Sequence, residues 1–252
     1  MTRCWQVLLF CLLHVSCLRG QQTLYVLFAA NPYTTDDIYR GCQMDRANTF
    51  DLFQAVDEIA CAQGYDMRTE LVDLPFEGDS VITFLRQFSP EQDDAVVYFY
   101  SSHGVQNLSG DIWPIQYFCP EPFDSGTVTT CGISLADVHG YLMHSRVRLS
   151  VTLGSCCNDD PYKASLPSTS PMHACDPKNT AGEALRGFDL LTRAQGHYIA
   201  AASRPGEKAF LTDSTGSQYV HALLNRLLDA LSSNQPASWH EILAGDDAKC
   251  VL

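Results

Sequence analysis

The runs Ala95-Val-Val-Tyr-Phe-Tyr100 and Val147-Arg-Leu-Ser-Val-Thr-Leu153 decide the expected fold. Both are rich in β-branched and aromatic residues, as is typical of strands buried within a sheet. The first run leads into Ser-Ser-His-Gly, and the second leads into Gly-Ser-Cys-Cys. Because working groups in open α/β sheets gather beyond the carboxyl ends of parallel strands, we expect His103 and Cys156 to meet at one edge of a sheet.

Further strands and helices alternate on both sides of these two runs. Strands are expected at 24–30, 68–74 and 197–202, and helices at 45–62, 79–88, 134–143 and 217–231. This alternation predicts one α/β domain, a three-layer α/β/α sandwich with a mainly parallel sheet. After a turn at 107–110, residues 111–116 are expected to pair back as a hairpin. Residues 158–179 are rich in Pro, Ser and Asp and are expected to form a long loop.

The first twenty residues have the pattern of a secretory signal peptide. Arg3 supplies a basic start, an apolar run follows at 7–15, and small residues lie before the expected cleavage after Gly20. The run is short for a bilayer span of about 20 residues, and no later segment is apolar enough. We therefore expect residues 21–252 to form a single domain without a membrane span, in a secreted, secretory or lysosome-like location.

Composition narrows the classes of partner. The chain has 252 residues, of which 46% are hydrophobic and 18% charged, which suits a globular protein. The formal net charge is −13. A chain this acidic is a poor candidate for nucleic-acid binding, which needs a basic face, and the charge also disfavours adhesion to anionic membranes.

Export changes how the cysteines and one sequon are interpreted. Cysteines of a secreted chain tend to pair. We expect a disulfide between Cys119 and Cys131, which flank a loop containing Pro and Gly, and a second between Cys157 and Cys175. Asn107-Leu-Ser is an acceptor sequon for glycosylation, although turn chemistry alone also explains an Asn there.

His103 and Cys156 have the residue types of a nucleophile and its base. A cysteine nucleophile needs a nearby base or a lowered pKa, and histidine supplies either. Gly104 leaves room for a substrate carbonyl, and the backbone N–H groups of Gly104 and Cys156 can form an oxyanion hole. The alternatives are a buried structural histidine, a Cys156 bound in a disulfide, and Cys157 as the nucleophile.

Four motifs in order resemble the caspase-like clan of cysteine peptidases, and metacaspases in particular. They are Arg40-Gly-Cys42 with Asp45 and Asn48, Tyr98-Phe-Tyr-Ser-Ser-His-Gly104, Leu153-Gly-Ser-Cys-Cys157, and the stretch from Ile199 to Leu224. The resemblance covers nearly all of residues 23–232. It implies a caspase-haemoglobinase-like sandwich with a large-subunit-like part at about 23–157, a linker loop at 158–190 and a small-subunit-like part at 191–252.

The resemblance implies a secreted cysteine endopeptidase that acts on a peptide or protein substrate through an acyl-enzyme. His103 would be the general acid/base and Cys156 the nucleophile. In metacaspases two acids and a serine hold a basic P1 side chain. Asp45 matches the second acid and Ser101 the serine, but Gly154 stands where the family has its acid two positions before the nucleophile. No arginine matches the one with which caspases hold aspartate, so strict cleavage after Asp is not expected. The alternative is an inactive homologue that acts as a secreted binding or regulatory module.

No cofactor or metal is expected for this chemistry. The loop acids Asp159, Asp160 and Asp176 are the candidates for a calcium site, as in some metacaspases. Acidic residues in loops are by default solvated.

Overall fold

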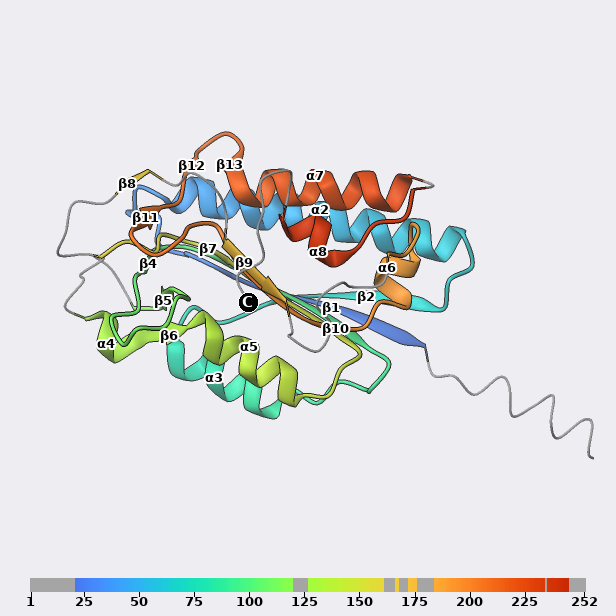
Figure 1. The fold of residues 1–252 in the computed structure, drawn as a ribbon, viewed down its shortest axis with the longest axis horizontal. Coiled ribbons are helices and arrows are strands. Elements are labelled where there is room, and N and C mark those ends of the chain that lie inside the picture. Colours follow the sequence, from blue (N-terminus) through green and yellow to red (C-terminus); the bar gives the residue numbers. More distant parts are fainter. Residues whose placement is uncertain are drawn as a thin grey trace, which may run out of the picture.

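The computed structural model of the chain is built around one central sheet between two layers of helices (Figure 1). It describes residues 21–119, 127–160, 166–167, 172–175, 184–233 and 235–244. The expected signal peptide at 1–20 lies outside these ranges. Within them, no helix has both the length and the apolar character needed to cross a bilayer.

The central sheet is mainly parallel, as the alternation of strands and helices predicted. In spatial order its strands are β2 (Met67–Asp73), β1 (Gln22–Ala30), β3 (Ala95–Ser101), β7 (Leu149–Ser155), β10 (Gly196–Ala201) and β9 (Met172–Cys175). All pairs are parallel except β10 with β9. Every residue of β3 and of β7 is buried, because helices cover both faces of the sheet. The predicted three-layer α/β/α sandwich is confirmed.

The two helical layers bury opposite faces of the strands. One layer holds α2 (Tyr39–Ala62), α7 (Gln218–Ser232) and α8 (Trp239–Ala244), and the other holds α3 (Gly78–Gln87) and α5 (Leu135–His144) (Figure 1). Val97, Phe99, Val151 and Leu153 pack in the core under α2 and α7. Val96, Tyr98 and Tyr100 pack in the core on the α3 and α5 side. Side chains of successive strand residues thus alternate between the two faces of the sheet.

The register of the middle strands aligns their carboxyl ends. Ala30 at the end of β1 lies beside Ser101 at the end of β3, and Ser101 lies beside Ser155 at the end of β7. The chain therefore leaves all three strands at one edge of the sheet. The loops that follow are brought together there, whatever their separation in sequence.

Several short elements lie at the edge of the sheet where β1, β3 and β7 end. The predicted hairpin forms between β4 (Gly104–Val105) and β5 (Ile115–Tyr117), and β6 (Gly132–Ser134) extends it. Other short elements at this edge are α4 (Val128–Cys131), β8 (Leu166–Pro167), β11 (Glu207–Lys208), β12 (Leu211–Thr212) and β13 (Gly216–Ser217). The short helix α6 (Asp189–Thr192) lies at the opposite edge, before the start of β10 (Figure 1). The loop predicted at 158–179 is wrong in part, because β8 and β9 lie within it. Pairing with β10 makes β9 a strand despite its weak local strand signal.

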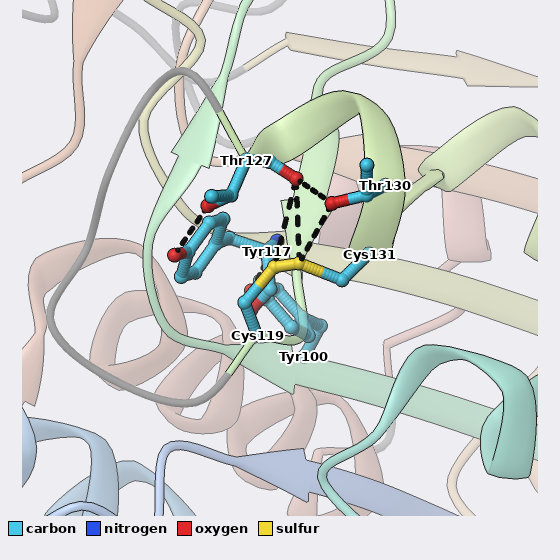
Figure 2. Close-up of a disulfide and its surroundings, with 6 residues drawn as sticks. All are labelled: Tyr100, Tyr117, Cys119, Thr127, Thr130 and Cys131. Atoms are coloured by element: carbon cyan, nitrogen blue, oxygen red, sulfur yellow. Dashed lines mark hydrogen bonds between the residues drawn. A yellow bond between two sulfur atoms is a disulfide. The ribbon is translucent and has the colours of Figure 1, made fainter.

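Cys119 and Cys131 form a disulfide in the structure, with their Cα atoms 5.4 Å apart (Figure 2). It joins the end of the β5 segment to α4. Nearby, the hydroxyls of Tyr117 and Thr127 lie 3.0 Å apart, and the Thr130 hydroxyl donates to the Thr127 carbonyl oxygen at 2.7 Å.

The second predicted disulfide, between Cys157 and Cys175, is not formed. Cys157 is a free thiol. Cys175 lies beside Tyr198 of β10, and Tyr198 lies beside Val151, six residues before Cys157. Six residues of extended chain span about 20 Å, whereas disulfide-bonded Cα atoms lie within about 7 Å of each other.

The disulfide generates a stability prediction. Replacing Cys119 and Cys131 together by serine should lower the free energy of unfolding by about 3 kcal/mol, since the bond closes a loop of this size in the unfolded chain. Urea unfolding measures the loss. The matched control is Cys61→Ser, which changes an exposed free thiol and should leave the midpoint unchanged. Mapping of unreduced peptides that joins Cys119 to another cysteine would contradict the pairing.

Candidate functional site

His103 follows the end of β3, on the edge where the chain leaves the sheet. The Tyr100 hydroxyl fixes the backbone there: it donates to the His103 carbonyl oxygen at 2.6 Å and accepts from the Tyr117 N–H at 2.7 Å. Burial first, and then the neighbouring Cys156, raise the pKa of Tyr100 well above its usual value, so this hydroxyl keeps its proton. The imidazole is thus carried by a rigid backbone.

A carboxylate from the loop after β1 contacts the imidazole. Nε2 of His103 lies 2.9 Å from Oδ2 and 3.1 Å from Oδ1 of Asp36. The side chain of Asp36 is 6% exposed and that of His103 is 22% exposed. Burial acts to raise the pKa of Asp36, but the Ile38 N–H and the nearby His103 outweigh it, and the pKa is lowered. Asp36 is therefore ionised at neutral pH.

Cys156 and Cys157 lie in different surroundings at the end of β7. Cys156 is 2% exposed and packs in the core on the α3 and α5 side, together with Tyr98 and Tyr100. Burial, followed by the neighbouring thiols of Cys157 and Cys42, raises the pKa of Cys156 well above its usual value. In this arrangement the Cys156 thiol is shielded and protonated.

Cys157 is half-buried, and its thiol is free. Burial is also the largest cause of its raised pKa, and Asp159 adds to it. Two groups act in the opposite direction, because the Ala209 N–H bonds the sulfur and the Lys208 ammonium lies nearby. Cys157 is therefore the more accessible of the two thiols and the one with groups that stabilise a thiolate.

The segments after β3 and β7 remain in contact beyond the strands. A Cβ atom at Gly104 would lie 2.7 Å from Sγ of Cys156 and 2.7 Å from the carbonyl oxygen of Cys157, so only glycine permits this approach. The Ser203 hydroxyl donates to the Cys156 carbonyl oxygen at 2.8 Å. Asn158, fully buried, donates through its amide to the Ile112 carbonyl oxygen at 2.9 Å. The cysteine-bearing turn is thus held from three sides.

Asp45 and Ser101 contact each other, but inside the protein. The Ser101 hydroxyl donates to Oδ2 of Asp45 at 2.6 Å, and the Ser217 N–H donates to Oδ1 at 2.7 Å. Both side chains are fully buried. Burial raises the pKa of Asp45 to about 7, against the opposing effect of the two hydrogen bonds. In this arrangement neither carboxylate oxygen faces the surface, where a P1 side chain would arrive.

The candidates for other sites are dispersed. Asp159 lies 3.9 Å from the Lys208 ammonium, Asp160 is buried, and Asp176 lies outside the described residues. Among the described residues, one group has donors close enough to share a metal ion: Asp36, Asp37 and His103. Asn107 lies in the turn between β4 and β5, where its side chain accepts from the Ser109 N–H at 3.0 Å. Glycosylation there stays a prediction.

Sequence reasoning missed the two residues that hold His103. Asp36 lies in a polar loop whose acids have no distinguishing pattern, and only the adjacency of β1 and β3 brings it to the imidazole. Tyr100 belongs to the buried strand β3, as the sequence predicts. Its hydroxyl at the strand end, two residues before the Ser-His pair, was the available signal.

Comparisons with known proteins give a distant likeness. No protein-family model matches the chain, and no curated protein sequence matches it. Among solved structures, the crystal structure of caspase-1 from Spodoptera frugiperda superposes with a TM-score of 0.46 and 11% sequence identity, over 83% of this chain and 69% of that chain. A likeness of this degree carries no argument about activity.

The raised pKa of Asp45 generates a prediction about pH and stability. In the unfolded chain an aspartate titrates near 3.9. Because the folded state holds this proton up to about pH 7, the stabilising contribution is complete below pH 4 and is lost as the pH rises through 7. Asp45→Asn, which keeps both hydrogen-bonding positions, should remove this dependence, a difference on the order of 4 kcal/mol across the window.

Urea unfolding of wild type and Asp45→Asn at intervals from pH 4 to pH 8 measures the difference. The control is Asp51→Asn, an exposed position on the same helix, whose curve should follow that of wild type. Parallel curves for wild type and Asp45→Asn would show that Asp45 is ionised in the folded protein throughout.

Proposed function

We propose that the protein is a cysteine endopeptidase of the caspase-like type, in which His103 is the general acid/base and a thiol at the end of β7 is the nucleophile. One observation carries the proposal: a histidine and a cysteine follow neighbouring parallel strands at matching positions. Ser101 and Ser155 lie side by side, and His103 and Cys157 each come two residues later. The motif resemblance described above points to the same chemistry.

The geometry favours Cys157 over Cys156, the nucleophile expected from the motif alignment. Thr152 and Gly154 of β7 point toward helix α5. Thr152 contacts His139, and Gly154 packs against Leu135. These side positions therefore lie on the face of the sheet opposite to α2. Ser101, at the end of β3, donates a hydrogen bond to Asp45 of α2, so its side chain lies on the α2 face of the sheet. Beyond the strand ends, Cys157 is half-buried, whereas Cys156 is 2% exposed. Cys156 is therefore less open to a substrate than Cys157.

The proposed reaction is acyl transfer in two steps. His103 takes the thiol proton, and the sulfur attacks the carbonyl carbon of the scissile peptide bond. The C–N bond breaks as the imidazolium gives the proton to the leaving nitrogen, and a thioester remains. Water, deprotonated by His103, then attacks the thioester carbon, and the thiol leaves with the proton. The N–H groups of Gly104 and of the nucleophilic cysteine are proposed to bind the oxyanion.

For the substrate and the location, the proposal goes only as far as a peptide or protein substrate and a secreted protein. A basic P1 side chain would need Asp45 or Ser101 to become accessible, because the two now bond each other inside the core. Secretion rests on the signal-peptide pattern of residues 1–20, and a glycan at Asn107 rests on the sequon.

Alanine variants of the two cysteines test the proposal. Cys157→Ala should lose peptidase activity on the order of 10⁴-fold or more, because nucleophile and base act as a unit. The matched variant Cys156→Ala removes a buried sulfur and should cost about 1 kcal/mol of stability while activity is retained. Initial rates on a mixed peptide library, with urea unfolding of each variant, measure both effects.

Labelling gives the same answer without substitutions. A thiol-reactive peptidyl probe applied to the wild-type chain should modify Cys157, as located by mass spectrometry of the digested protein. Modification of Cys156, with loss of activity in Cys156→Ala alone, would return the nucleophile to the position that the motif alignment favours. No probe labelling and no turnover would reject the peptidase in favour of an inactive binding module.

A further inference from the structure

We propose that Asp36 is a positioning residue that turns the cysteine–histidine pair into a Cys–His–Asp triad. The inference rests on the proposed function, since it concerns the base of that reaction. No motif identified Asp36, and its position follows from the sheet. The loop at 31–38 leaves β1 beside the end of β3, and the Asn31 N–H donates to the Ser101 carbonyl oxygen at 3.1 Å.

The carboxylate approaches the imidazole in the manner of an orienting group. Both oxygens lie within 3.1 Å of Nε2 of His103. A carboxylate at this place accepts the Nε2 proton and thereby fixes the tautomer. Nδ1 is then the ring nitrogen that takes the thiol proton. The carboxylate also stabilises the imidazolium that forms when the proton has moved.

Asp36 is itself held in place by hydrogen bonds. An incidental ion pair at a surface lacks such support. The Asn31 amide donates to Oδ2 at 2.6 Å, and the Ile38 N–H donates to Oδ1 at 3.1 Å. Asn31 is fully buried, and its own carbonyl oxygen accepts from the Gln43 amide at 2.8 Å. The chain of hydrogen bonds runs from helix α2 through Asn31 and Asp36 to His103, so the imidazole is oriented by the fold.

The ionisation of Asp36 supports the assignment. Burial alone would raise the pKa of this carboxyl, but the hydrogen bond from Ile38 and the adjacent His103 keep the pKa below its usual value. The negative charge is therefore present at neutral pH, where a positive imidazole has to be stabilised. The side chain of Asp36 is only 6% exposed, so solvent screens the interaction between Asp36 and His103 weakly.

Three variants of the full-length chain separate positioning from charge and from folding. Asp36→Asn keeps the shape but removes the negative charge and one of the two acceptor oxygens, and kcat should fall on the order of 10²- to 10⁴-fold with KM little changed. Asp36→Glu keeps a carboxylate and should recover part of the loss. Asp51→Asn removes the same charge at an exposed position of α2, away from His103, and should behave as wild type.

A second measurement does not depend on peptidase activity. The rate at which iodoacetamide alkylates Cys157 at neutral pH, followed by mass spectrometry with EDTA present, reports the thiolate that an oriented imidazolium stabilises. Wild type and Asp51→Asn should react at one rate, and Asp36→Asn more slowly. Circular dichroism and thermal unfolding verify that all variants fold, and a folded Asp36→Glu keeps the test valid if Asp36→Asn does not fold.

The outcomes are distinct from those for the proposed function. Equal alkylation rates in wild type and Asp36→Asn, or a loss of kcat shared equally by Asp51→Asn, would overturn the triad while leaving the peptidase intact. A chain without peptidase activity whose Cys157 alkylation still depends on Asp36 would reject the peptidase and leave the positioning role supported.

Discussion

The site depends on one constraint, the parallel register of β1, β3 and β7. Hydrogen bonds between these strands place Ala30, Ser101 and Ser155 in one row, so that the loops after them emerge together. Asp36, His103 and Cys157 each lie in one of those three loops. A shift of one residue in any strand would turn its outgoing side chain to the other face of the sheet. The buried faces of β3 and β7 make such a shift costly.

The fold was predictable to a greater extent than the site. The apolar runs at β1, β3, β7 and β10 are short, continuous and separated by amphipathic helices, and these local signals give the layers and the parallel sheet. Element ends agreed within a few residues, although α2 begins at Tyr39, six residues before its expected start. The strand β9 was missed, since it owes its form to β10 rather than to its own residues.

Site residues were harder to predict, because their roles come from the side of the strand on which they lie. His103 and the cysteine pair stood out as reactive types at strand ends. Cys156 and Cys157 follow the same strand, so the sequence does not show which of them is exposed. In the structure Cys156 is buried with Tyr98 and Tyr100, whereas Cys157 is half-buried. Asp36 is an ordinary acid in the sequence, and its partner His103 comes from a distant segment. Asp45 stood out through the motif resemblance, but its burial against Ser101 and Ser217 is visible only in three dimensions.

The hydrogen bond from the Ser217 N–H to Asp45 joins residues 172 positions apart and ties the start of α7 to α2. With the pairing of β7 and β10, it links the half of the molecule that precedes Cys157 to the half that follows Gly196. These links are noncovalent and lie within a shared core. In topological terms, the two halves are joined directly by the pairing of β7 with β10 and by the bond from Ser217 to Asp45, in addition to the peptide chain between them.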